Sequence, residues 1–371
     1  MSQDFVTQLR LQLREAALQE ERRAPAAQRL VLARRRLPGP AGVAAAATAA
    51  VLALAIALGA LSLRGEPEPT KPKVVRSFRV ADGLTSMDRG FGAVWATELS
   101  NGTVLRIDPR TRKVVARIPV AVAGGRSVHP DAFVAAGAGA VWVLAGDLQN
   151  GGHDGPVQLL RIDPRRNRVV ARIPLAKPSG GTFSPQGVHV GEGVVWVIGS
   201  AGALQIDPVG NTPQRYVPIT GAERGVVARG DALWMLGLDG RLRQVDARSG
   251  RTVRTVRVPV SARTRLGGGD PGQLSLVSDQ RLTVFDATNG RVLWRASFEA
   301  PLRSFAPGRD DTLWVFLDRA PERRDRVVRI DGGTGRRTGQ VDLSDPGVAG
   351  LAQIGRDLWV AGSDGRIAVV R

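Results

Sequence analysis

The segment from residue 93 to residue 119 reads AVWATELSNGTVLRIDPRTRKVVARIP, and its pattern returns in residues 141–174 as VWVLAGDLQNGGHDGPVQLLRIDPRRNRVVARIP. In both copies, short apolar runs are separated by Gly, Asn, Asp and Pro, which favour turns. A Trp between apolar residues marks the first run, Ile-Asp-Pro ends the second, and Ile-Pro ends the third. The pattern predicts a unit of short strands that is repeated along the chain.

The Trp of this unit recurs through the rest of the chain and sets the period of the repeat. One copy lacks the Trp, and counting back from its turn residues Asp279 and Asp286 places Leu274 in that position. The seven marker positions are Trp95, Trp142, Trp196, Trp234, Leu274, Trp314 and Trp359, which lie between 38 and 54 residues apart. A period of this length with about four short strands is typical of β-propeller blades. We therefore predict an all-β, seven-bladed β-propeller, with the marker side chains in its core and Trp294 in a fourth strand.

The two ends of the repeated region predict how the ring closes. The last copy stops after its third strand, at Arg371. Residues 73–80, KVVRSFRV, align with residues 113–120, KVVARIPV, which form the fourth strand of the first copy. We expect residues 73–80 to pair with the last copy as its missing strand. This pairing would close the ring and remove two exposed sheet edges.

An Asp follows the second apolar run in six copies: Asp108, Asp163, Asp207, Asp246, Asp286 and Asp331. Such a series suggests either metal ligands and acid–base groups, or residues that cap turns. Each Asp precedes Pro, Ala or Gly, and the side chain of an Asp in such a turn accepts hydrogen bonds from backbone N–H groups. We interpret the series as structural turn caps.

Residues 39–63 contain no charged side chain, and as a helix they are long enough to cross a hydrocarbon core of roughly 30 Å. Residues 1–38 carry eight Arg, so the positive-inside rule places the N-terminus in the cytoplasm. We predict a basic, helical cytoplasmic segment over residues 1–38 and a single-pass transmembrane helix over 39–63. A Pro-rich linker over 64–72 and an extracytoplasmic propeller over 73–371 follow. A cleaved signal peptide and a twin-arginine signal are the alternatives.

The charge balance suggests acidic partners. With 52 Lys and Arg against 34 Asp and Glu, the formal net charge is +18, which favours nucleic acid, anionic lipid or a cell-wall polyanion. The alternative is that Arg residues are spread over the solvated surface, which gives the same net charge without an acidic partner. We expect no nucleic-acid partner, because one Tyr and nine Phe offer few rings for bases to stack on. The chain has no cysteine, which excludes disulfides, thiolate metal sites and Cys nucleophiles.

The pattern apolar-Trp-Val, then Ile-Asp-Pro-x-x-x-x-Val-Val-Ala-x-Ile-Pro, resembles the YVTN-type propeller repeat that is shared with the virginiamycin B lyase (streptogramin lyase) family. The resemblance covers residues 73–371 and implies the propeller fold. It also implies a site with His, Glu and a magnesium ion, but His129, His153 and His189 do not occupy equivalent positions in their copies. Residues 285–294, FDATNGRVLW, resemble the repeat of quinoprotein-type propellers, and a single copy implies no quinone cofactor.

Propellers bind ligands at one mouth of the central channel, where loops lead into the innermost strand of each blade. Counting ten residues back from each marker aligns Thr85, Ala132, Gln186, Arg224, Thr264, Ser304 and Ala349 at this mouth. From these positions and their neighbours we select six ligand-binding candidates: Gln186, Arg224, Arg265, Arg303, Ser304 and Asp131. Three Arg beside Gln and Ser suit an anionic or sugar-like ligand. The alternative is that these are solvated loop residues.

The sequence contains no Gly-x-Ser-x-Gly elbow, no phosphate-binding loop of the Gly-x-x-x-x-Gly-Lys type and no matched set of His residues. We therefore expect no catalytic residues, no metal site and no cofactor. The prediction is a ligand- or protein-binding module on the outer face of the cytoplasmic membrane, with an unknown protein, a glycan or an anionic cell-wall ligand as its partner. Two alternatives stay open: a lyase or hydrolase that acts at the mouth, and a transmembrane sensor with a cytoplasmic regulatory segment.

Overall fold

The computed structural model describes residues 71–98, 102–120, 134–145, 157–175, 185–191, 193–199, 202–218, 223–229, 232–246, 248–261, 264–268, 272–319, 324–343 and 347–371. Every regular element in these ranges is a β-strand, and within them no helix is long and apolar enough to cross a membrane. The predicted cytoplasmic segment, the transmembrane helix and most of the linker lie outside the described residues, so they stay predictions.

The strands form seven antiparallel four-stranded sheets, called blades 1 to 7 here. Blade 1 contains β2 (Ser86–Gly90), β3 (Ala93–Glu98), β4 (Thr103–Ile107) and β5 (Val114–Pro119). Blade 2 contains β6 (Val134–Gly137), β7 (Ala140–Ala145), β8 (Gln158–Asp163) and β9 (Arg168–Pro174). Blade 3 contains β10 (Pro185–Gly191), β11 (Val194–Gly199), β12 (Gly202–Asp207) and β13 (Thr212–Pro218).

Blade 4 contains β14 (Glu223–Arg229), β15 (Ala232–Gly237), β16 (Arg241–Asp246) and β17 (Thr252–Arg257). Blade 5 contains β18 (Arg265–Gly268), β19 (Gln273–Ser278), β20 (Arg281–Asp286) and β21 (Val292–Ser297). Blade 6 contains β22 (Leu302–Pro307), β23 (Thr312–Leu317), β24 (Arg326–Asp331) and β25 (Arg337–Asp342). Blade 7 contains β26 (Val348–Ile354), β27 (Asp357–Gly362), β28 (Arg366–Val370) and the first strand of the ring, β1 (Val74–Arg79).

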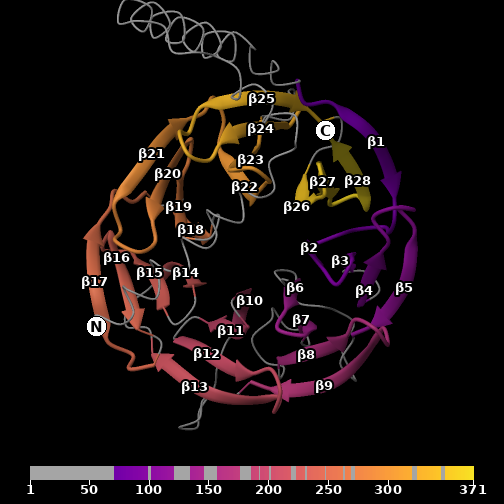
Figure 1. Ribbon diagram of the computed structural model, residues 1–371, viewed down its shortest axis with the longest axis horizontal. Helices are drawn as coiled ribbons and strands as arrows, with labels where there is room; N and C mark the ends of the chain where they lie inside the picture. Colours follow the sequence, from indigo (N-terminus) through magenta and orange to yellow (C-terminus); the bar gives the residue numbers. More distant parts are fainter. Residues whose placement is uncertain are drawn as a thin grey trace, which may run out of the picture. The chain divides into compact units, whose positions relative to one another are not determined.

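The blades stand side by side around a central axis (Figure 1). In each blade the first strand, such as β2 or β6, is innermost, and the fourth strand, such as β5 or β9, lies on the perimeter (Figure 1). Across blades 1 to 6 the order of the strands in the sheet follows their order in the chain. The prediction of an all-β, seven-bladed β-propeller is therefore confirmed.

Blade 7 closes the ring with a strand from the other end of the domain. β1 pairs antiparallel with β28, and Phe78 lies opposite Ile367. Lys73 and Arg371 exchange backbone hydrogen bonds of 2.9 and 3.0 Å. The ring of Phe78 meets that of Trp359 edge-on, with 5.3 Å between the centroids. The indigo and yellow strands that lie side by side in Figure 1 are this closing pair, so the predicted closure is confirmed.

Strand direction gives the ring two distinct faces. Because neighbouring strands are antiparallel, the connections from first to second strand and from third to fourth strand of every blade lie on one face, called the turn face here. The connections from second to third strand, and from one blade to the next, lie on the opposite face, called the loop face. β28 ends and β1 begins on the turn face, because they take the third and fourth places in blade 7.

The marker Trp side chains fill the spaces between neighbouring blades. The six side chains Trp95, Trp142, Trp196, Trp234, Trp314 and Trp359 are at most 4% exposed. Each faces the following blade; Trp142, for example, packs in one apolar cluster with Val188 and Val197 of blade 3. An Arg of the same sheet lies over Trp95, Trp142 and Trp314, with its guanidinium 5.5, 5.8 and 6.0 Å from the ring centroid. The prediction that these Trp form the core is confirmed.

The marker position predicted for blade 5 is wrong by one residue. Strand pairing places Ser275, not Leu274, where the other blades have the Trp. The cause is the length of the hairpin between β19 and β20. Four residues separate the paired residues Val277 and Leu282, whereas five separate the equivalent pair Leu236 and Leu242 in blade 4. The counts back from Asp279 and from Asp286 both include residues of this shorter hairpin, so both place the marker one residue too early. Leu274 is buried, but it faces blade 4.

Two aromatic side chains replace the missing Trp between blades 5 and 6. Trp294 of β21 and Phe305 of β22 both lie in the apolar cluster that joins these blades. Trp294 Nε1 donates a hydrogen bond to the carbonyl oxygen of Gly332 in blade 6. Phe305 lies so close to Gly267 that a Cβ at this position would collide with its ring. The assignment of Trp294 to a fourth strand is confirmed, and the structure adds its role in this interface.

The substitution Ser275→Ala is expected to raise the free energy of unfolding by about 1 kcal/mol. Ser275 is 1% exposed, and its Oγ has no hydrogen-bond partner among the described residues, so its removal relieves a desolvation penalty. Urea unfolding of a fragment of residues 69–371, the compact unit that holds the ring, measures the change. Ser278→Ala is the control, because Ser278 Oγ is 2.5 Å from Thr264 Oγ1 and its loss is expected to destabilise the ring. Equal destabilisation by both substitutions would contradict the prediction.

The repeated Asp residues cap the turns between third and fourth strands. Asp163 Oδ1 accepts hydrogen bonds from the backbone N–H groups of Arg165 and Arg166, at 2.7 and 3.1 Å. The carboxylates of Asp108, Asp207, Asp246, Asp286 and Asp331 likewise accept hydrogen bonds from backbone N–H groups of their own turns. Hydrogen bonds within the turns lower the pKa of all six carboxyl groups. The interpretation of this series as turn caps is confirmed.

Candidate functional site

The predicted mouth residues lie near the start of the innermost strands, at the loop face. Gln186 is in β10, Arg224 in β14, Arg265 in β18, and both Arg303 and Ser304 in β22. Four consecutive blades, 3 to 6, therefore contribute candidates at the same end of the ring. The side chains of Gln186 and Arg224, and the whole of Asp131, lie outside the described part of the chain. That any of these residues contacts a ligand stays a prediction.

A β-bulge recurs at the start of four innermost strands. In blade 3, Pro185 and Gly187 pair with consecutive residues of β11, so Gln186 has no partner in the ladder. The same irregularity leaves Arg224, Arg303 and Ala349 outside the ladders of blades 4, 6 and 7. A bulge bends the strand and re-aims the side chain of the extra residue, and bulges are frequent next to binding sites. Three of the six candidates thus occupy equivalent and unusual backbone positions, which the repeat pattern does not reveal.

The exposed Arg side chains of blades 5 and 6 differ in their partners. Arg303 is 60% exposed and forms an ion pair with Asp318 through its Nε. An ion pair that is this exposed contributes about 0–1 kcal/mol, so an incoming anion can replace Asp318 with little loss. Arg265 is exposed at the first position of β18, opposite Val277. Ser304 is half-buried and pairs with Phe316, so it is a less accessible candidate than its neighbour Arg303.

A pocket of about 600 Å³ with a mixed polar and apolar lining lies beside these strands, at the loop face of blade 5. Its lining includes Ser261, Ser278, Asp279, Gln280 and Arg281. Ser261 Oγ donates to Asp279 Oδ2 at 3.0 Å, and Ser278 Oγ lies 2.5 Å from the hydroxyl of Thr264, which is 2% exposed. Hydroxyl, amide and charged groups around one cavity suit a polar ligand. The sequence analysis missed this pocket, because its residues come from three separate connections on the loop face.

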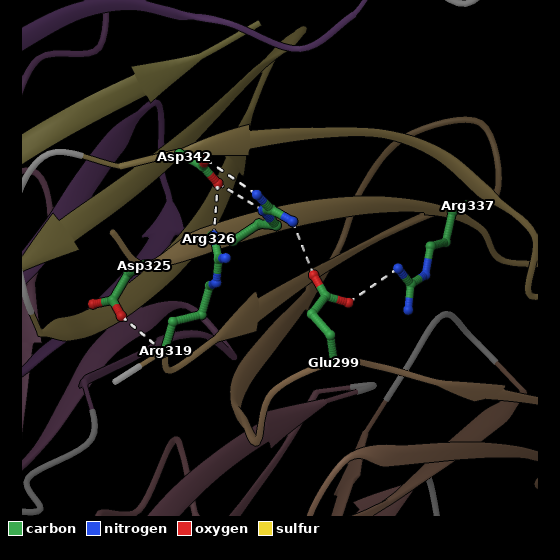
Figure 2. Close-up of polar contacts among 6 residues, drawn as sticks. All are labelled: Glu299, Arg319, Asp325, Arg326, Arg337 and Asp342. Atoms are coloured by element: carbon green, nitrogen blue, oxygen red, sulfur yellow. Dashed lines mark hydrogen bonds and ion pairs between the residues drawn. The ribbon is translucent and has the colours of Figure 1, made fainter. Parts of the chain in front are cut away.

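A network of ion pairs joins blades 5 and 6 on the perimeter of the ring (Figure 2). The guanidinium of Arg326 binds Asp342 through two hydrogen bonds, of 2.6 and 3.1 Å, and Glu299 through a third of 3.0 Å. Arg337 donates to the other oxygen of Glu299 at 3.1 Å, and Arg319 lies 3.5 Å from Asp342. The bonds between Arg326 and Asp342 raise the pKa of the guanidinium and lower that of the carboxyl group.

These charges are already paired within the protein, so we assign the network a structural role. Two further contacts extend it toward blade 7. The carboxylate of Asp325 accepts hydrogen bonds of 3.2 Å from the backbone N–H groups of Arg319 and Gly347. Figure 2 shows Arg319 between the two acidic residues Asp325 and Asp342. The network therefore fixes the connections that lead into and out of blade 6, and with them the strands that carry Arg303.

The inner strand of blade 1 carries the one described Asp whose pKa is raised. Burial raises the pKa of Asp88 above the usual range of a carboxyl group. Its Oδ2 accepts a hydrogen bond of 2.7 Å from the backbone N–H of Ala136 on β6, and Ser86 Oγ accepts one of 3.2 Å from Val134. Both bonds give a partner to a backbone N–H group on the free edge of β6, the innermost strand of blade 2. Asp88 therefore links blade 1 to blade 2, and nothing around it points to acid–base chemistry.

Within the described ranges, no group of three or more His, Cys, Asp or Glu is placed to hold a metal ion. His189 lies on β10 opposite Trp196, whereas His129 and His153 lie outside the described residues. The loop face presents exposed guanidinium groups and hydroxyl groups, and two of these hydroxyl groups, those of Ser261 and Thr103, donate to the carboxylates of Asp279 and Glu98.

No protein-family model matches this chain, and no curated protein matches it either. The fold implied by the resemblance to propeller repeats is present in full, since seven four-stranded blades close into a ring. Membership of the YVTN-type or virginiamycin B lyase family stays a prediction. A β-propeller fold of this kind suggests a binding or scaffold module. The chain is thus a propeller repeat protein by its fold.

Proposed function

We propose that this chain is a single-pass membrane protein whose propeller stands outside the cytoplasmic membrane and binds an anionic or polar ligand at the loop face. The bulge that recurs at the start of four innermost strands carries the proposal. It gives Gln186, Arg224 and Arg303 the same backbone setting in blades 3, 4 and 6, around one mouth. Arg265 adds an exposed guanidinium on the strand between those of Arg224 and Arg303.

The membrane part of the proposal rests on the sequence and on how the ring closes. Residues 39–63 carry no charge and are followed by a linker with three Pro before residue 73. β1 then completes the ring as the fourth strand of blade 7. A ring that closes on its own strand can stand on a tether as an independent unit. This favours an anchored receptor or scaffold rather than a domain built into the membrane.

A thermal-shift screen of the fragment 69–371 tests the ligand site. The panel holds sugars, muropeptides, teichoic-acid fragments, nucleotides and divalent cations. A ligand at about a hundred times its Kd stabilises the folded state by roughly 2.7 kcal/mol, which is readily seen as a shift in Tm. We expect a hit among anionic or sugar-like compounds that is lost in the triple variant Arg224→Ala, Arg265→Ala, Arg303→Ala.

The matched control removes three exposed Arg of the outer strands, Arg172→Ala, Arg257→Ala and Arg295→Ala, and it is expected to keep the shift. If the control loses the shift as fully as the mouth variant, binding follows net charge and the mouth is not the site. If every compound leaves Tm unchanged, the small-ligand proposal is wrong, and the scaffold role suggested by the fold remains.

A further inference from the structure

Exposed basic side chains lie in turns on the turn face, and six of them lie near the point where the chain enters the ring. The turn between the third and fourth strands of blade 1 exposes Arg110 and Lys113, and the same turn of blade 2 exposes Arg165 and Arg168. Lys71 and Lys73 are exposed at the start of the closing strand, in the adjoining blade 7. We name these six residues the basic arc. It spans three neighbouring blades (Figure 1).

Little negative charge opposes the basic arc. In these two turns, Asp108 and Asp163 each direct one carboxylate oxygen to backbone N–H groups, and the other oxygen of Asp163 forms an exposed ion pair of 3.5 Å with Arg166. In blade 7, both carboxylate oxygens of Asp357 bind the guanidinium of Arg371, at 2.6 and 2.8 Å. Within the described residues, the side chains of Arg110 and Arg165 form no ion pair; Asp163 pairs with Arg166 instead. The arc is therefore positively charged and accessible.

A cavity of about 920 Å³ opens within the basic arc, between blades 1 and 2. Four Arg and one Asp line it: Arg106, Arg161, Arg165, Arg166 and Asp163. Its apolar wall includes Phe91, which is 42% exposed on the turn between β2 and β3. On the same face, Val209 is 82% exposed at the turn of blade 3. Guanidinium groups beside exposed apolar side chains are the combination that binds the surface of an anionic bilayer.

The direction of β1 brings this face toward the membrane if the anchor is where we propose it. β1 begins on the turn face, so the linker joins the ring there. Nine linker residues, 64–72, span at most about 28 Å in the extended conformation that Pro favours. A tether this short holds the turn face near the bilayer, and it leaves the loop face with its mouth directed away.

We infer that the basic arc docks on the anionic phospholipid surface of the membrane and orients the propeller. Arg165 binds headgroup phosphates at the cavity, Arg166 exchanges its exposed ion pair with Asp163 for a phosphate, and Phe91 and Val209 enter the interface. The inference rests on the proposed function for its anchor, but the docking surface belongs to the ring alone. Each Lys or Arg near such a surface contributes about fivefold in affinity, and salt screens the attraction.

Sedimentation of the fragment 69–371 with lipid vesicles tests the inference without the anchor. We expect binding to vesicles that contain phosphatidylglycerol, release at high salt and no binding to pure phosphatidylcholine. The variant Arg110→Glu, Lys113→Glu, Arg165→Glu, Arg168→Glu is expected to bind at least about a hundredfold more weakly. The control Arg172→Glu, Arg257→Glu, Arg281→Glu, Arg295→Glu makes the same change in net charge on outer strands and the loop face, and it is expected to lose less than about tenfold.

Three results would overturn the inference. Equal losses in both variants would show that net charge, and not the arc, binds lipid. Absence of binding to anionic vesicles would exclude docking, and binding to purified teichoic acid alone would assign the arc to a cell-wall polymer. Unchanged melting temperatures show that the variants are folded. If the full chain is found in the membrane fraction but the fragment 69–371 does not bind vesicles, this inference is wrong and the proposed function is not contradicted.

Discussion

Deletion of residues 73–80 from the ring fragment is expected to abolish its cooperative unfolding transition. The fragment 81–371 lacks β1, so β28 becomes an open edge and Trp359 loses the ring of Phe78. Val80, which is 7% exposed, is lost as well. Together these losses amount to about 5 kcal/mol or more, which is comparable to the whole net stability of many domains. Circular dichroism during thermal unfolding, compared with the fragment 71–371, measures the effect.

A circular permutant provides the control for this deletion. Lys73 and Arg371 are neighbours in the ladder, so residues 73–80 can follow Arg371 through a short turn like the one at Asp108–Lys113. The permutant then has an ordinary fourth strand in blade 7, and its Tm is expected to lie within a few degrees of that of the fragment 71–371. A stable fragment 81–371 would contradict the role of β1 in closing the ring, and so would a permutant that fails to fold.

The substitution Trp142→Ala is expected to lower the free energy of unfolding by about 3–5 kcal/mol. Trp142 is fully buried between blades 2 and 3, its Nε1 donates to the carbonyl oxygen of Gly137 at 3.0 Å, and the guanidinium of Arg161 lies 5.8 Å from its centroid. Truncation leaves a cavity and removes the support of Arg161. Urea unfolding of the fragment 69–371 gives the change.

Val170→Ala is the control for the Trp substitution. Val170 is 41% exposed on the outer strand of the same blade, and its truncation is expected to change the free energy of unfolding by no more than about 0.5 kcal/mol. A loss below about 1 kcal/mol for Trp142→Ala would mean that the spaces between blades collapse around the missing ring. The interfaces would then be less closely packed than the structure indicates.

The sequence predicts the blades well, because each copy repeats both its turn residues and its buried residues. The closure was predictable for the same reason, since residues 73–80 have the pattern of a fourth strand. The one marker error, Leu274 for Ser275, comes from a hairpin that is shorter by one residue. Nothing in the local sequence shows that a Ser occupies a Trp position, because the side chains that fill the gap, Trp294 and Phe305, come from other strands.

The sequence predicts where the mouth residues lie in each blade, but it does not predict which residue of each innermost strand occupies the bulge. Counting ten residues back from the marker reaches the bulged residues Gln186, Arg224 and Ala349. In blade 6 the same count reaches Ser304, one residue after the bulge at Arg303. The turn between the first and second strands of blade 6 is longer by one residue. Trp314 pairs with Ala306, eight residues earlier, whereas in blade 7 Trp359 pairs with Ala352, seven residues earlier.

Contacts that join different blades are the features that sequence patterns leave out. The hydroxyl groups of the loop-face pocket and the ion pairs around Arg326 come from segments that meet only when the ring is closed. The basic arc is another case, because its residues are far apart in the chain and share a face through strand direction alone. A repeat pattern specifies what one blade is, and the ring determines which side chains become neighbours.

The central claim is that the propeller stands outside the membrane while the N-terminus stays inside. The chain contains no cysteine, so single substitutions provide unique labelling sites. Leu238→Cys reports on the ring, because Leu238 is 51% exposed in the connection between β15 and β16 on the loop face, and Ser2→Cys reports on the N-terminus. In intact cells, a membrane-impermeant maleimide is expected to label Leu238→Cys at once and Ser2→Cys only after lysis. Labelling of Ser2→Cys alone, or recovery of the full chain in the soluble fraction, would contradict the account.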